Sequence, residues 1–255
     1  MTEPLYLDYN ATTPVDPRVL EAMLPWLREG FGNPSSDHVY GRRAKAAVDA
    51  ARARVAELIG ARPEEIVFTG CATEANNLAI QGAARAAGAS GRRRLATSAI
   101  EHPSVARPLA ELARNGWAVD ELPVDAEARV RLVSVTDAVG ADTLLVSVML
   151  ANNEVGTIQP IRAIADRAHA VGALMHVDAA QAAGKIPVDV DDLGADLLTL
   201  AGHKFYAPKG VGALYVREGT PLAAITHGAG HERGLRPGTE NVPHIVGLGE
   251  AARLA

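Results

Sequence analysis

The sequence predicts an α/β protein of three layers, in which helices cover both faces of a mostly parallel central sheet. Short apolar runs alternate along the chain with helical patterns of about a dozen residues, which is typical of βαβ units. The predicted strands at 143–150 and 197–200 are apolar on both faces, as a sheet covered by helices on both sides requires. Polar or glycine turns separate the elements, and the chain contains no internal repeat, low-complexity tract or obvious linker.

The elements are assigned in chain order from apolar runs, helical spacing and glycine stops. Glycine after a helical pattern marks its end, because glycine readily adopts the left-handed conformation that terminates helices. Gly60, Gly88 and Gly172 stand at such positions. We expect helices at residues 39–59, 73–87, 105–114 and 161–170. We expect strands at residues 65–69, 94–98, 117–122, 143–150, 173–177, 196–200 and 212–216.

The composition is that of a folded globular protein, with 255 residues, 48% of them hydrophobic and 22% charged. The 25 basic and 30 acidic residues give a net charge of −5, which argues against a general binder of nucleic acid or acidic membranes. Cys71 is the single cysteine, which excludes an internal disulfide and fits a reducing compartment. The N-terminus lacks the apolar segment of a signal peptide, and the longest apolar stretch, 144–151, is far below the roughly 18 residues of a spanning helix. We therefore expect a cytoplasmic protein.

Polar side chains follow five of the predicted strands at the point where each strand ends. In open α/β sheets, ligands bind outside the carboxyl ends of the strands, so these side chains are expected to share one edge. They are Thr73, His102, Asn153, Asp178, Gln181, His203 and Lys204. The sequence therefore predicts a binding site at this edge.

Lys204 and Asp178 each allow a functional and a purely structural interpretation. A lysine amine in a partly dry site has a lowered pKa and becomes a nucleophile toward aldehydes, but Lys204 can equally be a solvated turn residue. A carboxylate at the end of an apolar strand needs a cation or a hydrogen-bond donor. Asp178 can meet a protonated pyridine nitrogen there, or cap a helix that follows it.

Two predicted helix starts near the same edge are equally ambiguous. The glycine-containing turn 69–73 opens a helix whose free N–H groups favour a phosphate, although Thr73 can simply cap that helix. His102 precedes another helix and can stack on a flat ring or cap a turn. Together with Lys204 and Asp178, these features describe one cofactor, pyridoxal 5′-phosphate (PLP).

A metal site is the main alternative for the same region. Its ligands would be His102, His176, Asp178 and His203, and His176 and Asp178 face the same side of a strand. This interpretation leaves Lys204 unexplained, and the sequence has neither an HExxH motif nor a second cysteine. We therefore expect no metal.

The motifs resemble those of cysteine desulfurases in the class V aminotransferase superfamily, which are fold-type I PLP enzymes. The resemblance runs nearly from end to end, and eight motifs occur in the order of the family. They are YLDYNATTP (6–14), FGNPSS (31–36), EEIVFTGCATEANNLAI (64–80), IEHPSV (100–105), NNEVGTIQP (152–160), HVDAAQAAGKIPVDV (176–190), GHKFYAPKGVGALYV (202–216) and GHERGLRPGTENV (230–242).

The resemblance implies a role for each candidate residue. Lys204 corresponds to the Schiff-base lysine, and His102 to the residue that stacks on the cofactor ring and assists proton transfer. Asp178 corresponds to the pyridinium partner and Gln181 to the donor for the phenolic oxygen. The cofactor-binding set that the resemblance implies is Ala72, Thr73, Asn153, Asp178, Gln181, His203, Lys204 and Thr239. Thr73 and His203 are implied phosphate ligands, Asn153 lies near the substrate carboxylate, and Thr239 reaches the phosphate of the partner subunit in a homodimer.

The chain departs from the family pattern in three ways. Ala201 stands where the family has a serine before Gly-His-Lys, and Ala207 replaces the glycine of Tyr-Gly-Pro. We expect residues 1–15 to form an N-terminal arm and residues 16–255 a PLP-binding large domain. The C-terminal small domain, with its sulfur-accepting loop cysteine and its carboxylate-binding arginine, is expected to be absent from this chain. Cys71 does not match that loop cysteine, and we expect it to be a small buried filler.

The implied function is that of a PLP-dependent cysteine desulfurase. The family converts L-cysteine to L-alanine and passes the sulfur on for iron–sulfur cluster or related sulfur assembly. The expected partners are L-cysteine, a sulfur-acceptor or scaffold protein and a second copy of the chain, without nucleic acid or membrane. With the loop cysteine missing, we expect the chain to release little sulfide by itself. Two alternatives remain open: another PLP lyase, such as a selenocysteine lyase or a β-eliminating lyase, and a non-catalytic truncated paralogue that acts as an interaction subunit.

Overall fold

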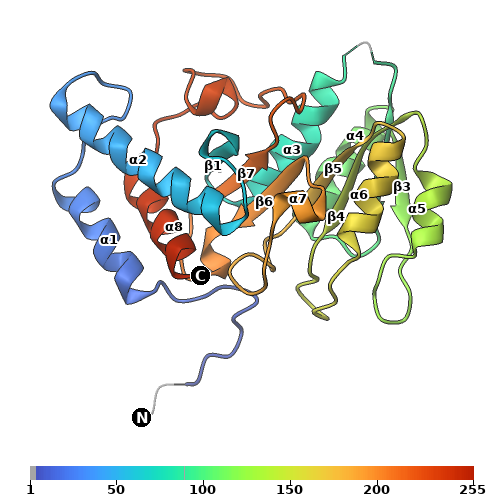
Figure 1. Ribbon diagram of the computed structural model, residues 1–255, viewed down its shortest axis with the longest axis horizontal. Helices are drawn as coiled ribbons and strands as arrows, with labels where there is room; N and C mark the ends of the chain where they lie inside the picture. The colour runs from blue at the N-terminus through green and yellow to red at the C-terminus, as the bar shows by residue number, and fades with distance from the viewer. Residues whose placement is uncertain (1–3, 89) are drawn as a thin grey trace.

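The computed structural model describes residues 4–88 and 90–255, and their strands form a seven-stranded sheet (Figure 1). The order across the sheet is β1-β7-β6-β5-β4-β2-β3, and β7 is the strand that runs antiparallel to its neighbours. The strands are β1 (Ile66–Thr69), β2 (Arg94–Ser98), β3 (Ala118–Leu122), β4 (Thr143–Met149), β5 (Leu174–Asp178), β6 (Leu197–Ala201) and β7 (Gly212–Val216). The predicted strands and the mostly parallel arrangement are therefore confirmed.

The helices confirm the four expected from sequence and add others. They are α1 (Pro17–Arg28), α2 (Val39–Leu58), α3 (Ala72–Ala86), α4 (Pro103–Arg114), α5 (Leu132–Ala138), α6 (Ile161–Ala170), α7 (Val190–Leu193) and α8 (Val242–Leu254). Short 3₁₀ turns occur at Pro63–Glu65, Gly202–Lys204 and Glu232–Gly234. None of the helices in the described ranges combines the length and the apolar character that crossing a bilayer requires.

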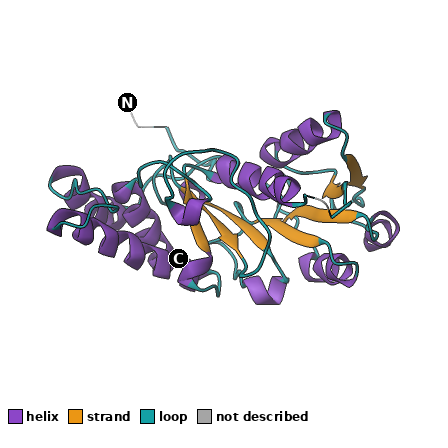
Figure 2. Cartoon of the chain, turned by 90° about the horizontal axis from the view of Figure 1, so that it is seen from above, coloured by secondary structure: helices purple, strands orange, loops and turns teal. Residues whose placement is uncertain are grey.

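Helices cover both faces of the sheet, which completes the three layers (Figure 2). On one face, Leu78 of α3 and Leu109 of α4 pack with Leu145 of β4 in one apolar cluster. On the other face, Ile164 of α6 joins a larger cluster with Val146 of β4. All five side chains are almost fully buried, and burial of each contributes about 1.5–3 kcal/mol to folding.

Helices α1, α2 and α8 gather at the end of the molecule beside β1 and β7 (Figure 1). Helix α8 packs against both of the others, and Gly249 makes its close approach to α2 possible. A Cβ atom at Gly249 would lie 2.6 Å from the Cβ of Ala51, which no real pair of side chains tolerates. The segment before α1 leaves this group and runs toward the carboxyl ends of the central strands.

Candidate active site

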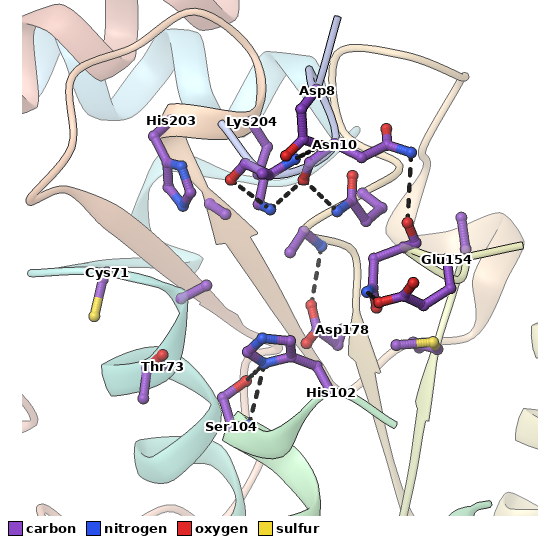
Figure 3. A pocket seen from close by; sticks show the side chains of 18 residues that line it. Asp8, Asn10, Cys71, Thr73, His102, Ser104, Glu154, Asp178, His203 and Lys204 are labelled. Atoms are coloured by element: carbon purple, nitrogen blue, oxygen red, sulfur yellow. Dashed lines mark hydrogen bonds between the residues drawn. The ribbon is translucent and has the colours of Figure 1, made fainter. Parts of the chain in front are cut away.

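A cavity of about 570 Å³ lies at the carboxyl ends of the parallel strands (Figure 3). The structure brings together nearly all residues that the sequence pointed to. Those lining the cavity are Ala72, Thr73, His102, Asn153, Asp178, Gln181, His203 and Lys204. Thr239 does not line it and is exposed in the loop after the 3₁₀ turn at Glu232–Gly234, so its role across a dimer interface stays a prediction.

Lys204 stands at the end of the short 3₁₀ turn that follows β6. Its Nζ donates to the carbonyl oxygens of Asn10 and Ala11, the latter at 3.0 Å. Partial burial lowers the pKa of Lys204, and the negative charges of Asp178 and Asp8 oppose this shift in part. A lowered pKa leaves more of the amine uncharged near neutral pH, which is the form that attacks a carbonyl carbon.

Asp178 is the last residue of β5 and is buried. Its Oδ1 accepts the N–H of Ala180 at 2.9 Å, and its Oδ2 accepts from Nδ2 of Asn76 at 2.8 Å. Burial raises the pKa of Asp178, whereas these two donors and the charges of His102 and Lys204 lower it. Among the described residues no ion pair includes Asp178, so this carboxylate suits a cationic ligand. The alternative of a cap is confirmed in part, because Asp178 accepts the N–H of Ala180, but the segment that follows is a turn and not a helix.

Helix α3 begins at the cavity with its first N–H groups open. Cys71 is the N-cap residue, and its side chain makes no capping hydrogen bond. The N–H groups of a first helical turn lack intrahelical acceptors, so this end attracts an anion. The backbone of this turn lies close to Gly212. A Cβ atom at Gly212 would be 2.8 Å from the carbonyl carbon of Cys71, so only glycine allows this approach. The interpretation that Thr73 caps the helix is therefore wrong.

The surroundings of Cys71 differ from those expected for a buried core residue. It is half-buried and lines the cavity, so the expectation of a small buried filler is wrong. The reason is its position at the N-cap, where the chain leaves β1 and enters α3 at the edge of the sheet.

His102 both caps α4 and faces the cavity. Its Nδ1 accepts the N–H of Ser104 at 3.1 Å and lies 2.7 Å from the Ser104 hydroxyl oxygen. The capping interpretation is confirmed, and the position on the cavity wall leaves the ring free to contact a flat ligand (Figure 3).

The N-terminal segment closes one side of the cavity, which the sequence did not indicate. Oxygen Oγ1 of Thr12 lies 3.1 Å from Nδ1 of His203, and the Asn10 carbonyl accepts from Nε2 of Gln181 at 2.9 Å. Nδ2 of Asn10 donates to the Asn153 carbonyl at 3.4 Å. The polar run in YLDYN was the available signal.

Glu101 is a further residue that sequence reasoning missed. Its Oε1 accepts the N–H of Met149 at 2.9 Å and the hydroxyl of Ser98, while Oε2 is buried without a partner among the described residues. Burial raises the pKa of Glu101 to about 8. The signal was an acidic residue directly before His102 at the end of a strand.

The residues proposed as ligands of an alternative metal site are not grouped in the described part of the structure. Within residues 4–88 and 90–255, no three His, Cys, Asp or Glu side chains are arranged to hold an ion. His176, one of the proposed ligands, is fully buried in the sheet between Ser147 at 2.8 Å and Thr199 at 3.1 Å. Burial lowers its pKa to about 3, so it stays neutral.

Comparison with known proteins identifies the family of the chain. The sequence model for class-V aminotransferases matches residues 5–255. The chain belongs to the class-V aminotransferase family. Class-V aminotransferases and the cysteine desulfurases among them depend on PLP, which is the cofactor of this family.

Curated relatives of the chain are cysteine desulfurases. It is 48% identical over 255 residues to cysteine desulfurase IscS of Dictyoglomus turgidum, and 51% identical over 255 residues to cysteine desulfurase IscS of Neisseria meningitidis. These matches cover 100% and 99% of this chain, but 64% and 63% of the relatives. The chain thus spans less than two thirds of the length of these relatives.

Solved structures share the fold of this chain. A NifS-like protein superposes with a TM-score of 0.96 at 43% identity, covering 99% of this chain and 69% of that one. SspA in complex with cysteine gives a TM-score of 0.94 at 43% identity, covering 98% and 72%. The three-layer fold with its mostly parallel sheet is therefore that of fold-type I PLP enzymes.

The cavity fits PLP by the chemistry of the groups that line it. Three groups face the same space: an amine with a lowered pKa, a buried carboxylate that makes no ion pair with any described residue, and a helix start without a side-chain cap. These are the groups that an aldehyde, a protonated pyridine nitrogen and a phosphate require.

Proposed function

We propose that this protein acts as a PLP-dependent cysteine desulfurase, which removes sulfur from L-cysteine and leaves L-alanine. The observation that carries the proposal is the convergence of Lys204, Asp178 and the open start of α3 on one cavity. The cysteine desulfurases among its relatives support the choice of reaction. A structural neighbour solved in complex with cysteine supports the choice of substrate.

Each group of the cavity has a place in holding the cofactor. Lys204 would carry it covalently, Asp178 would pair with its ring nitrogen, and the N–H groups at Ala72 and Thr73 would bind its phosphate together with His203. Gln181 would donate to the phenolic oxygen, and His102 would lie on the ring. When bound, PLP acts as an electron sink for the negative charge that develops at the α-carbon of the substrate.

The side chains around the reacting atoms hold protons and exclude water. The lowered pKa of Lys204 keeps its amine available to take the α-proton of the substrate. The segment around Asn10 covers Lys204 and Gln181 on the solvent side. Asn153 lies at the rim, where it can orient a substrate carboxylate.

The wider setting follows from the family. We propose that the protein works in the cytoplasm as a homodimer, in which Thr239 reaches the phosphate of the partner subunit. Exposed apolar side chains at Phe31, Val39 and Tyr40 provide surface for such an association. The sulfur would pass to an acceptor or scaffold protein for iron–sulfur cluster or related sulfur assembly.

The test is reduction of the protein with borohydride in the presence of PLP, followed by peptide mapping. We expect a pyridoxyl group on Lys204, lost in Lys204→Ala and retained in Lys209→Ala, whose lysine is exposed outside the cavity. Absence of any adduct on Lys204 would overturn the proposal.

The product distinguishes the proposed reaction from a related one. Incubation with L-cysteine and a thiol should yield L-alanine. Pyruvate instead of alanine would indicate β-elimination, which retains the cofactor but excludes desulfuration.

A further inference from the structure

Four polar side chains form a continuous hydrogen-bonded chain along the wall of the cavity. Nδ2 of Asn76 donates to Oδ2 of Asp178 and to the hydroxyl oxygen of Ser104, both at 2.8 Å. The Ser104 hydroxyl lies 2.7 Å from Nδ1 of His102. Asn76 is fully buried and Ser104 nearly so, which keeps water from replacing these bonds.

One orientation of the Asn76 amide suits both of its partners in this chain. Its two N–H bonds are shared between Asp178 and Ser104, and its Oδ1 is buried without a partner in the described residues. If the amide were turned round, its carbonyl oxygen would face the Asp178 carboxylate, and two acceptors would repel each other. The nitrogen therefore faces Asp178.

This orientation determines where the proton of Ser104 points. Because the Ser104 oxygen accepts from Asn76, its own hydrogen is free to go to Nδ1 of His102. The backbone N–H of Ser104 donates to the same nitrogen. Nδ1 of His102 thus accepts twice, so the neutral ring carries its proton on Nε2, which lies toward the cavity (Figure 3).

We propose that Asn76 and Ser104 are positioning residues that hold His102 as the Nε2–H tautomer and orient the Asp178 carboxylate. The consequence for catalysis rests on the proposed function. In the resting state Nε2–H of His102 is a hydrogen-bond donor that faces the cavity. His102 is therefore placed to orient a bound ligand through this donor.

The tautomer is measured by ¹⁵N NMR of the full chain labelled at histidine, with and without PLP. The His102 signals are assigned by their loss in His102→Gln. We expect the wild-type ring to show an unprotonated Nδ1 and a protonated Nε2. A wild-type ring that is mainly protonated at Nδ1 would overturn the proposal, and this measurement does not depend on whether Lys204 carries PLP.

Variants separate a positioning role from a general structural one. Ser104→Ala should increase the Nδ1–H form about tenfold, which corresponds to one hydrogen bond of about 1.4 kcal/mol, while Ser104→Thr keeps the hydroxyl and the wild-type tautomer. Equal tautomer ratios in wild type and Ser104→Ala would contradict the role of Ser104.

The role of Asn76 is tested by replacing it and, as a control, by replacing its neighbour in the same helix. Asn76→Leu should shift the tautomer in the same direction as Ser104→Ala and displace the visible absorption band of bound PLP. Asn77→Leu is the matched control, because Asn77 bonds the Thr73 carbonyl and Gln81 and takes no part in the chain of bonds to His102. An Asn76→Leu protein with the tautomer and spectrum of wild type would refute the assignment.

Discussion

At the scale of single residues, the site depends on charged groups that the fold keeps away from water. Asp178 and Glu101 are carboxyl groups whose pKa is raised by burial, and Lys204 is an amine whose pKa is lowered by it. In each case the shift favours the neutral form. The site therefore holds protons differently from the same side chains in water.

Glu101 should make folding stability depend on pH. The raised pKa of Glu101 keeps its proton in the folded state up to about pH 8, whereas the unfolded chain loses it near the ordinary glutamate pKa of 4.5. Stability from Glu101 is therefore complete below that lower pKa and decreases as the pH rises toward the folded pKa, by up to about 1.4 kcal/mol per pH unit. Urea unfolding of wild type and Glu101→Gln from pH 4 to 9 should show a steeper loss of stability with rising pH in wild type than in the variant, and parallel curves would disprove it.

The residue identities at the strand ends could be predicted, but their partners could not. The carboxyl ends of parallel strands meet by geometry, so Asp178 and Lys204 were expected in one place. Asn76 sits within a helix and Asn10 in an irregular segment, and neither follows a strand. Their contacts depend on how α3 and the N-terminal segment pack, which no local pattern specifies.

At the scale of elements, helix α3 leaves its N-terminus uncapped where a ligand can complete it. The uncapped start costs stability in the protein without cofactor and gains an anion site. Such an arrangement exchanges folding stability for binding.

Replacing Cys71 should separate these two effects. Cys71→Asp should cap α3 and raise the stability of the cofactor-free protein by about 0.5–2 kcal/mol. The same carboxylate should repel the phosphate and weaken PLP binding about tenfold or more. Cys71→Ser supplies a neutral cap and should gain stability with a smaller loss of affinity. The measurements are urea unfolding and PLP titration, and unchanged affinity in Cys71→Asp would argue against phosphate binding at α3.

The loop that carries Thr239 is held by a buried ion pair. Arg52 binds Glu232 through two hydrogen bonds of 2.8 and 2.7 Å, and Glu232 also accepts the N–H of Phe68 at 2.8 Å. Glu232 and Arg233 both have positive φ angles, 47° and 58°, which non-glycine residues rarely adopt. The pair thus holds a strained turn in place.

Breaking this pair should be costly. Arg52→Met leaves the Glu232 carboxylate buried without its cation, so we expect a loss of about 3–5 kcal/mol in the free energy of unfolding. Adding Glu232→Gln removes the orphaned charge and should restore part of the loss. Denaturant unfolding of the single and double variants tests this, and equal stabilities would exclude the explanation.

The elements themselves were largely predictable, with informative exceptions. Strands such as β4 are apolar throughout and bounded by turns, so they stand out in the sequence. Helix α1 was not expected, and it contains Pro25, which removes a helical N–H. The run IPVDV at 186–190 alternates in sequence as a strand does but forms none, because Asp189 caps α7 there by accepting N–H bonds from Asp191 and Asp192.

At the scale of the whole molecule, the N-terminal segment connects α1 to the wall of the cavity through hydrogen bonds. Thr13 donates its N–H to the carbonyl of His203 at 3.0 Å, and its hydroxyl accepts the N–H of Tyr206 at 2.9 Å. The division into an arm at 1–15 and a domain at 16–255 stays a prediction, but this segment packs as part of the site.

Thr13→Val should loosen that attachment. Valine has nearly the same shape but leaves the Tyr206 N–H without an acceptor, which costs about 1–3 kcal/mol of stability when the group is buried. Thr136→Val on α5 is the control, because its hydroxyl bonds only its own helix in an exposed position. Urea unfolding that does not distinguish the two variants would contradict the role of Thr13.

The contact between the N-terminal segment and Lys204 also has a consequence for folding during synthesis. The lysine and the Asn10 carbonyl that it contacts are 194 positions apart, and β1 joins the sheet through β7, which follows Lys204. A nascent chain on the ribosome holds Asn10 and β1 without their partners until Lys204 and β7 have been made. Capture of the vitamin B6 cofactor must therefore wait until the chain has emerged through β7.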